Sequence, residues 1–187
     1  MKLLANTALL IIDQQQGIDY PVLGARNNSA AERIMLTLLA HWRNCLWPVV
    51  HIKHRSAQRE SVFWPEQQGF AFKPEFIPTK LEWVIEKRTP CAFVNTPLEK
   101  ILRDLAVNTL VVVGASTNNS VEATVRMGGN IGFDMIVIED GCFAFAKTDY
   151  RGQLRTADDV HAMSLANLQG EYATVIHSSS LDLKFNC

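Results

Sequence analysis

The chain has 187 residues, of which 48% are hydrophobic and 20% are charged, and its formal net charge is −1. This length fits a single domain over residues 1–187 that can bury a hydrophobic core without disulfide or metal support. The balanced charge argues against nucleic acid and membrane surfaces as partners, and no apolar run reaches the 18 residues of a membrane span.

Apolar runs alternate with segments of helical period through the first half of the chain. Residues 7–13 (TALLIID) predict a buried strand, and residues 27–45 predict a helix that Asn28 or Ser29 can cap. Further strands are predicted at 48–54 (PVVHIKH) and 81–87 (LEWVIEK). Residues 96–106 predict a helix, with Thr96 at the N-cap, proline at the first helical position and glutamate at the third.

The same alternation continues in the second half. The run 109–114 (TLVVVG) predicts a deeply buried strand, followed by a helix from about residue 120 that weakens at Gly128 and Gly129. Strands are predicted at 134–140 and 172–178, with a capped helix at 156–170 between them. Strand–helix alternation with uninterrupted apolar strands favours a parallel sheet with helices on both faces, which is a three-layer α/β sandwich.

The connection over residues 54–80 is long and has no clear period. It holds three prolines and several aromatic residues. An irregular segment of this length in one domain is more often functional than not. Its aromatic side chains predict either an apolar rim of a substrate pocket or a packing or subunit contact, and the sequence favours neither.

Three reactive side chains fall at the carboxyl ends of predicted strands, where open parallel sheets bind ligands. Asp13 ends the first strand, Lys87 ends the third, and Ser120 follows the fourth in the turn GASTNNSV. Each has an ordinary alternative: a turn residue, a solvated lysine and a helix N-cap. Together they form an acid/base, a cation and a hydroxyl at a helix start, a set suited to nucleophilic catalysis.

The segments TALLIIDQQQG, EWVIEKRTPCAF, VVVGASTNNSVEATVR and GFDMIVIEDGC, with VHAMSLANLQGEYATVI, resemble the isochorismatase-like, or cysteine hydrolase, superfamily in order and spacing. The resemblance implies a six-stranded parallel sheet between helices and a hydrolase. In amidase members a triad of Asp, Lys and Cys would correspond to Asp13, Lys87 and Ser120. The resemblance also implies a cis peptide bond between Ala115 and Ser116, with the N–H groups of Ser116 and residue 120 as an oxyanion hole.

The sequence departs from the family at the nucleophile, because Ser120 stands at the cysteine position. A cysteine at a helix start near a lysine is readily ionised, whereas a serine hydroxyl needs a base in contact during the reaction. None of the five histidines lies in the turn, and only His54, at the end of a strand, is a candidate for the site. Cys91 and Cys142 are interpreted as small buried hydrophobes.

Four interpretations follow. Ser120 is the nucleophile of a hydrolase that cleaves a small non-peptide C–N bond, or Asp13 is the general acid of an isochorismatase-type vinyl-ether hydrolase. Alternatively, the fold is a catalytically inactive binding module, or a serine has been engineered in place of cysteine. The first is adopted as the working hypothesis, because Asp13 and Lys87 are both present.

The remaining expectations concern ligands and surroundings. Substrate contacts are predicted from His54, Phe63, Trp64 and Phe93, with a small molecule as the substrate. The HIKH spacing puts its two histidines on opposite faces of a strand, so no metal and no cofactor are expected. The family resemblance implies a homodimer or homotetramer, and four scattered cysteines without a CxxC pair favour reduced thiols in a cytoplasmic protein.

Overall fold

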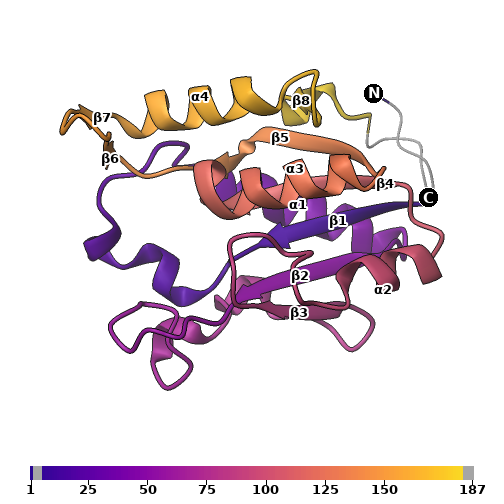
Figure 1. Cartoon of the computed structure of the whole chain (residues 1–187). Coiled ribbons are helices and arrows are strands. Elements are labelled where there is room, and N and C mark those ends of the chain that lie inside the picture. Colours follow the sequence, from indigo (N-terminus) through magenta and orange to yellow (C-terminus); the bar gives the residue numbers. More distant parts are fainter. Residues whose placement is uncertain (2–5, 183–187) are drawn as a thin grey trace.

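Six parallel strands form one sheet in the order β3-β2-β1-β4-β5-β8 in the computed structural model, which describes residue 1 and residues 6–182. Their bounds are β1 Thr7–Ile12, β2 Val49–His54, β3 Trp83–Lys87, β4 Thr109–Ala115, β5 Asp134–Phe143 and β8 Thr174–Ile176. A short antiparallel pair, β6 Lys147–Thr148 and β7 Leu154–Arg155, projects beyond the sheet (Figure 1). The predicted six-stranded parallel sheet is therefore confirmed.

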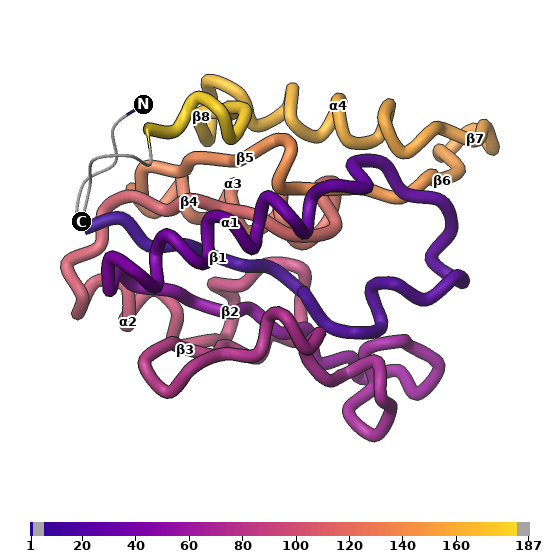
Figure 2. Tube along the Cα trace, turned by 180° about the vertical axis from the view of Figure 1, so that it is seen from behind, coloured from indigo at the N-terminus to yellow at the C-terminus, as the bar shows by residue number. Residues whose placement is uncertain are grey.

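Helices cover both faces of this sheet (Figures 1 and 2). One face is covered by α1, and the other by α2 and α3, with α4 packed beside α3 and β5. Their bounds are α1 Ala31–Asn44, α2 Leu98–Asp104, α3 Glu122–Asn130 and α4 Ala157–Leu168. The connections contain a π-helical turn, Thr117–Val121, and short 3₁₀ helices at Gln16–Asp19, Pro21–Leu23, Gln68–Phe70, Pro74–Phe76 and Ser178–Ser180.

Strand β1 divides the hydrophobic core into two layers. Because successive side chains of a strand point to opposite faces, Leu10 and Ile12 join the cluster beneath α2 and α3, whereas Leu9 and Ile11 join the cluster beneath α1. Both faces of β1 are fully buried, which explains why its sequence is apolar without alternation. None of the helices among the described residues has the length and apolarity needed to cross a bilayer.

Helix starts are where the structure departs most from the predictions. Helix α1 begins at Ala31 with Ala30 at its N-cap, so neither Asn28 nor Ser29 occupies the cap position. Helix α2 begins at Leu98, one residue later than expected. The Thr96 hydroxyl still accepts a hydrogen bond from the Leu98 N–H at 3.3 Å. The prediction was therefore right about the residue that binds the free N–H group at the helix start and wrong about the residue at which the helix begins. The predicted cap of α4 is present, as a capping box between Thr156 and Asp159.

Helix α3 continues through Gly128 and Gly129, although glycines weaken helices. Both are required by close packing. A Cβ at Gly128 would lie 2.6 Å from the Met135 sulfur, and one at Gly129 would lie 2.8 Å from the Tyr172 carbonyl oxygen. The glycines therefore let α3 approach the sheet and the segment before β8 closely.

The sequence predicts that all four cysteines are reduced thiols, and the structure departs from this at one of them. Cys91 and Cys142 are free, but Cys45 is disulfide-bonded, so the prediction was wrong for Cys45. Cys187 lies outside the described residues.

Two long segments extend past the carboxyl ends of β1 and β2, where the predicted site lies (Figure 2). One runs from Asp13 to α1 and the other from His54 to β3. They are joined by a backbone bridge between Gln15 and Phe72, and the Lys73 N–H donates to the Gln14 carbonyl at 3.1 Å. Lys73 also binds Asp19 at 2.8 Å and Glu32 at 2.9 Å, so ion pairs fix the same junction.

Candidate active site

Asp13 and Lys87 meet because each ends a strand of the same parallel sheet. Lys87 follows Ile85 on β3 and shares its face, beneath α2 and α3. Simple alternation would turn Asp13 with Ile11 toward α1. Asp13 instead has a φ of +53°, which ends the extended conformation, and its carboxylate binds Lys87. The left-handed residue at the end of β1 is therefore what brings the carboxylate to the site.

Ser120 lies inside the π-helical turn that leads from β4 into α3, rather than at a helix N-cap. The Val121 N–H donates to the Ser116 carbonyl at 3.2 Å, which is the five-residue spacing of a π-turn. Such turns are rare and are frequently found at functional sites. The peptide bond between Ala115 and Ser116, at the start of this turn, is cis.

Gly114 makes room for the turn. Its φ of +125° lies in a region that residues with a side chain rarely adopt, and an added Cβ would lie only 2.3 Å from the Ile12 carbonyl oxygen. The backbones of β1 and β4 thus approach each other more closely here than any other residue would allow. This approach places the Ser120 turn beside the end of β1.

Asp13, Lys87 and Ser120 form one buried cluster centred on the lysine. The Lys87 Nζ lies 2.8 Å from Asp13 Oδ2 and 3.1 Å from Ser120 Oγ. The residues are 3%, 0% and 5% exposed, so the cluster is almost closed to solvent. Asp13 Oδ1 has no hydrogen-bond partner among the described residues. A buried, unpaired carboxylate oxygen is costly, and it offers an acceptor for a proton or an N–H group at this point.

His54 also reaches this cluster. Its Nδ1 lies 3.2 Å from the Lys87 Nζ, and its ring meets Phe63 edge to face at 5.8 Å. Burial lowers the pKa of His54, and the positive charge of Lys87 lowers it further, while Asp13 acts in the opposite sense. The candidate histidine of the sequence analysis therefore lies in contact with the lysine.

Sequence reasoning missed Gln15, which fixes the end of β2. Its amide nitrogen donates to the carbonyls of His54 and Phe70, both at 3.0 Å, and its oxygen accepts the His54 N–H at 2.7 Å. Three polar residues in a row after an apolar strand, Gln14 to Gln16, were the available signal. A buried polar side chain at a strand end needs partners, and backbone groups of the long loop supply them.

Helix α4 holds the Ser120 turn from the other side, a second feature that the sequence did not indicate. His161 Nδ1 lies 2.8 Å from the Thr117 hydroxyl, and Ser164 donates to the Thr117 carbonyl at 3.0 Å. Ser164 also lies 2.7 Å from Glu122. Burial lowers the pKa of His161, which favours the neutral ring in this contact. The turn is thus braced through Thr117 rather than through Ser120.

The predicted aromatic contacts separate into two groups. Phe63 packs on His54, and Trp64 follows it in the loop and lines a cavity of about 250 Å³ with Arg55 and Arg88. Phe93 lies elsewhere: it stacks on Phe133, just before β5, at a ring separation of 5.8 Å and packs against the core. The structure therefore brings Phe63 to the site and packs the half-buried Phe93 against the core beneath α3.

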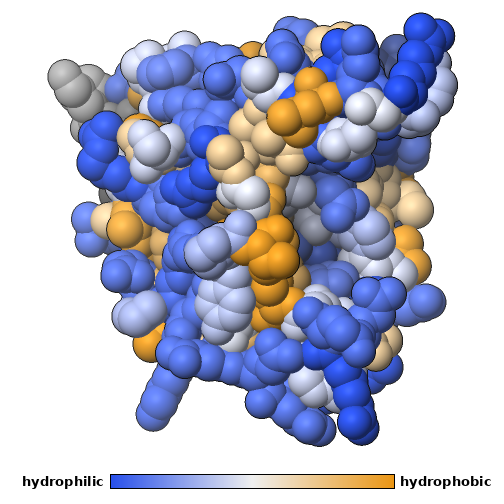
Figure 3. Space-filling model, turned by 90° about the vertical axis from the view of Figure 1, so that its left-hand side faces the viewer, coloured by the Kyte–Doolittle hydropathy of each residue, from blue (hydrophilic) through white to orange (hydrophobic). Residues whose placement is uncertain are grey.

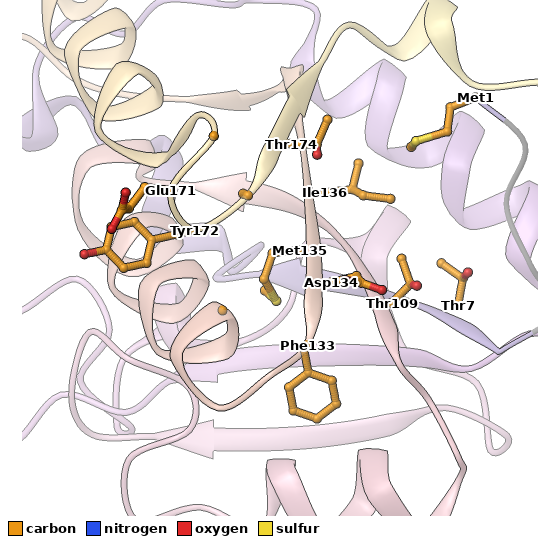
Figure 4. A pocket seen from close by; sticks show the side chains of 13 residues that line it. Met1, Thr7, Thr109, Phe133, Asp134, Met135, Ile136, Glu171, Tyr172 and Thr174 are labelled. Carbon is orange, nitrogen blue, oxygen red and sulfur yellow. The ribbon is translucent and has the colours of Figure 1, made fainter.

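Figure 3 shows the surface at the carboxyl ends of the strands, where hydrophobic side chains form a narrow band between hydrophilic ones. At the opposite end of the sheet lies a cavity of about 490 Å³ (Figure 4). Its lining includes Thr7, Thr109 and Thr174, which begin β1, β4 and β8. This second cavity therefore does not adjoin Ser120.

Other chemistry near the site is limited. Within the described part of the chain, no three histidine, cysteine or acidic side chains are grouped as a metal site would need. Cys142 is fully buried, and burial raises its pKa to about 12, so it is a poor candidate for a nucleophile. Ser120 is therefore the candidate nucleophile: its hydroxyl contacts Lys87, and Lys87 in turn contacts the Asp13 carboxylate.

Comparison with known proteins agrees with this fold. Residues 7–179 match the isochorismatase domain, and the chain belongs to the isochorismatase family. It is 37% identical over 174 residues to the uncharacterized isochorismatase family protein YrdC of Bacillus subtilis, covering 93% of both chains. It is 39% identical over 170 residues to the ureidoacrylate amidohydrolase RutB of Klebsiella pneumoniae, covering 72% of each. A crystal structure of an isochorismatase-family protein from Chromobacterium violaceum superimposes with a TM-score of 0.92 at 50% identity, covering 96% of this chain and 93% of that one.

Proposed function

We propose that this protein hydrolyses a small, non-peptide C–N bond of the amide type, with Ser120 as nucleophile. The observation that carries the proposal is the Lys87 Nζ, which binds both the Asp13 carboxylate and the Ser120 hydroxyl inside a closed cluster. The similarity to a ureidoacrylate amidohydrolase supports the same reaction class.

In the proposed reaction, Ser120 Oγ attacks the carbonyl carbon while its proton passes to Asp13. Lys87 donates to Ser120 Oγ, so the serine hydrogen is directed toward another acceptor, and the unpaired Asp13 Oδ1 is suited to receive it. The C–N bond then breaks, and Asp13 returns the proton to the leaving nitrogen. Water, activated by the same carboxylate, releases the acid and frees Ser120.

The negative charge on the carbonyl oxygen needs donors in the attack step. The N–H groups of Ser116 and Ser120 are proposed for this role, because Ser116 directly precedes the turn Thr117–Val121 and Ser120 lies within it. Lys87 is proposed to orient Asp13 and Ser120 and to offset their charge rather than to transfer protons itself.

Vinyl-ether hydrolysis is the alternative reaction, with Asp13 as the general acid. It would require Asp13 to carry a proton before the reaction. The Ser120 hydroxyl, 3.1 Å from the Lys87 Nζ, favours the amidase, because vinyl-ether hydrolysis needs no nucleophile at this position.

A panel of small primary amides, ureido acids and cyclic amides tests the proposal. Turnover is expected to rise in Ser120→Cys, because a thiolate is more easily formed than a serine alkoxide, and to disappear in Ser120→Ala. Asp13→Asn is expected to lower turnover by about 10²–10⁴-fold. Ser179→Ala, an exposed serine in a short helix before the chain end, is the control and is expected to change nothing.

Two outcomes would contradict the proposal. If Ser120→Cys is inert on the whole panel and Asp13→Asn changes nothing, the chain is not an amidase. If Ser120→Ala retains turnover that Asp13→Asn loses, the vinyl-ether reaction is the better account. Ligand-dependent thermal stabilisation without product would instead indicate a binding module.

A further inference from the structure

The Lys87 side chain has more partners than the reaction requires. Besides Asp13 Oδ2 and Ser120 Oγ, its Nζ lies 3.2 Å from His54 Nδ1, and the lysine is fully buried. An ammonium group has three hydrogens and no acceptor. One carboxylate, one hydroxyl and one imidazole therefore use all three of them.

This contact determines the proton arrangement of His54. Because the lysine can only donate, His54 Nδ1 must present its lone pair, and the hydrogen of the neutral ring must be on Nε2. The ring is held in this position by its surroundings. Gln15 binds both backbone groups of His54, and Phe63 packs against the ring.

We propose that His54 is a positioning residue that holds the Lys87 ammonium on Asp13 and Ser120, and that it does so only while its ring is neutral. The inference rests on the proposed function for its effect on catalysis. A protonated His54 has a hydrogen on Nδ1, so the lysine would lose one of its three acceptors and face a like charge at the same distance. Lys87 would then move away from one or both of its other partners.

The charges around the ring favour the neutral form. The charged groups that face it are Lys87 from β3 and Asp13 from the end of β1, and Phe63 from the loop adds none. Burial and Lys87 lower the pKa of His54, and Asp13 only partly offsets them. Catalysis is therefore expected to be unaffected at neutral pH and to decline on the acid side.

His51 offers a matched control on the same strand. It is also buried, and burial lowers its pKa as well, but its Nε2 binds Glu82 at 3.0 Å beneath the opposite face of the sheet. His54 is half-buried, and a general effect of removing a histidine from β2 would appear in both positions. An effect through Lys87 would appear only at His54.

The first measurement does not depend on activity. Nitrogen-15 NMR of the imidazole rings is expected to show His54 with the hydrogen on Nε2 at neutral pH. Lys87→Met is expected to raise the His54 pKa, because a neighbouring positive charge is removed while Asp13 remains, and to leave the His51 pKa unchanged. A His54 ring with its hydrogen on Nδ1, or a pKa insensitive to Lys87→Met, overturns the inference whether or not the protein is an amidase.

The second measurement is the pH dependence of kcat/KM on any amide that is turned over. For the wild type we expect a fall of about tenfold per pH unit below the His54 pKa found by NMR. His54→Asn keeps an acceptor near the Nδ1 position and cannot titrate, so it is expected to lose this acid limb, with a kcat at neutral pH between those of the wild type and His54→Leu. His54→Leu is expected to lower kcat at every pH, while His51→Gln keeps the wild-type profile. An unchanged acid limb in His54→Asn contradicts the inference.

Discussion

Replacing Lys87 by methionine should destabilise the fold strongly, because it leaves the Asp13 carboxylate buried without its donor. Lys87 is fully buried and Asp13 is 3% exposed, and Asp13 Oδ1 already has no partner among the described residues. Removing one member of a buried ion pair costs about 3–5 kcal/mol. Methionine has a similar length, so the loss reflects the charge and hydrogen bonds rather than a cavity.

The carboxylate can be neutralised to isolate this cause. In Lys87→Met/Asp13→Asn the buried group is an uncharged amide, which costs about 1–3 kcal/mol if unsatisfied. The second substitution should therefore recover about 2 kcal/mol of the loss, measured as the difference in unfolding free energy between the double variant and Lys87→Met. The expected order of stability is wild type, then the double variant, then Lys87→Met.

Urea unfolding followed by circular dichroism measures these differences, provided that the slope with denaturant stays constant. The exposed pair of Lys100 and Asp104, which are 77% and 61% exposed and 2.6 Å apart, serves as the control. Lys100→Met should change the stability by no more than about 0.5 kcal/mol. If Lys87→Met costs as little as Lys100→Met, or if Asp13→Asn restores nothing, the buried charge does not govern this part of the fold.

Three further results are expected. Gly114→Ala should be much more destabilising in urea than Gly132→Ala: both glycines have positive φ, but a Cβ at Gly114 collides with the Ile12 backbone while one at Gly132 meets nothing within 4 Å. Equal losses would refute the close approach of β1 and β4. Thermal stability should fall as pH is lowered through about 6.5, because the unfolded chain takes up protons there that the folded histidines resist; the groups with lowered pKa values are His51, His54 and His161. A melting temperature that is constant from pH 7.5 to 5.5 would contradict this. Iodoacetamide should leave Cys142 unmodified in the native protein at pH 8, since its pKa is raised to about 12, and mass spectrometry would reveal any labelling.

Much of the sheet could be predicted from the sequence because its central strands, β1 and β4, are buried on both faces. The uninterrupted apolar run ending in Asp13 and the shorter alternating run ending in Lys87 indicated strands whose carboxyl ends share one edge of the sheet. His54 and Lys87 are register partners in β2 and β3, so their contact follows from pairing that the sequence leaves unspecified.

The local backbone of the site was harder to predict. The position of the Asp13 carboxylate depends on a positive φ, and Ser120 lies in a π-turn instead of at a helix cap. Both are set by tertiary packing, including the approach at Gly114 and the brace from α4. Phe93 illustrates the same point, since its half-buried ring stacks on Phe133 and packs against the core, a contact that the sequence does not specify.

The most direct test of the account is to trap the covalent intermediate on Ser120. An amide that is turned over would be mixed with the enzyme and quenched in acid on the millisecond to second scale, and the adduct would be mapped by peptide mass spectrometry. We predict an added acyl mass on the peptide that contains Ser120, absent from Ser120→Ala. Turnover of the same amide by Ser120→Ala at the wild-type rate, with no adduct on the wild type, would contradict it.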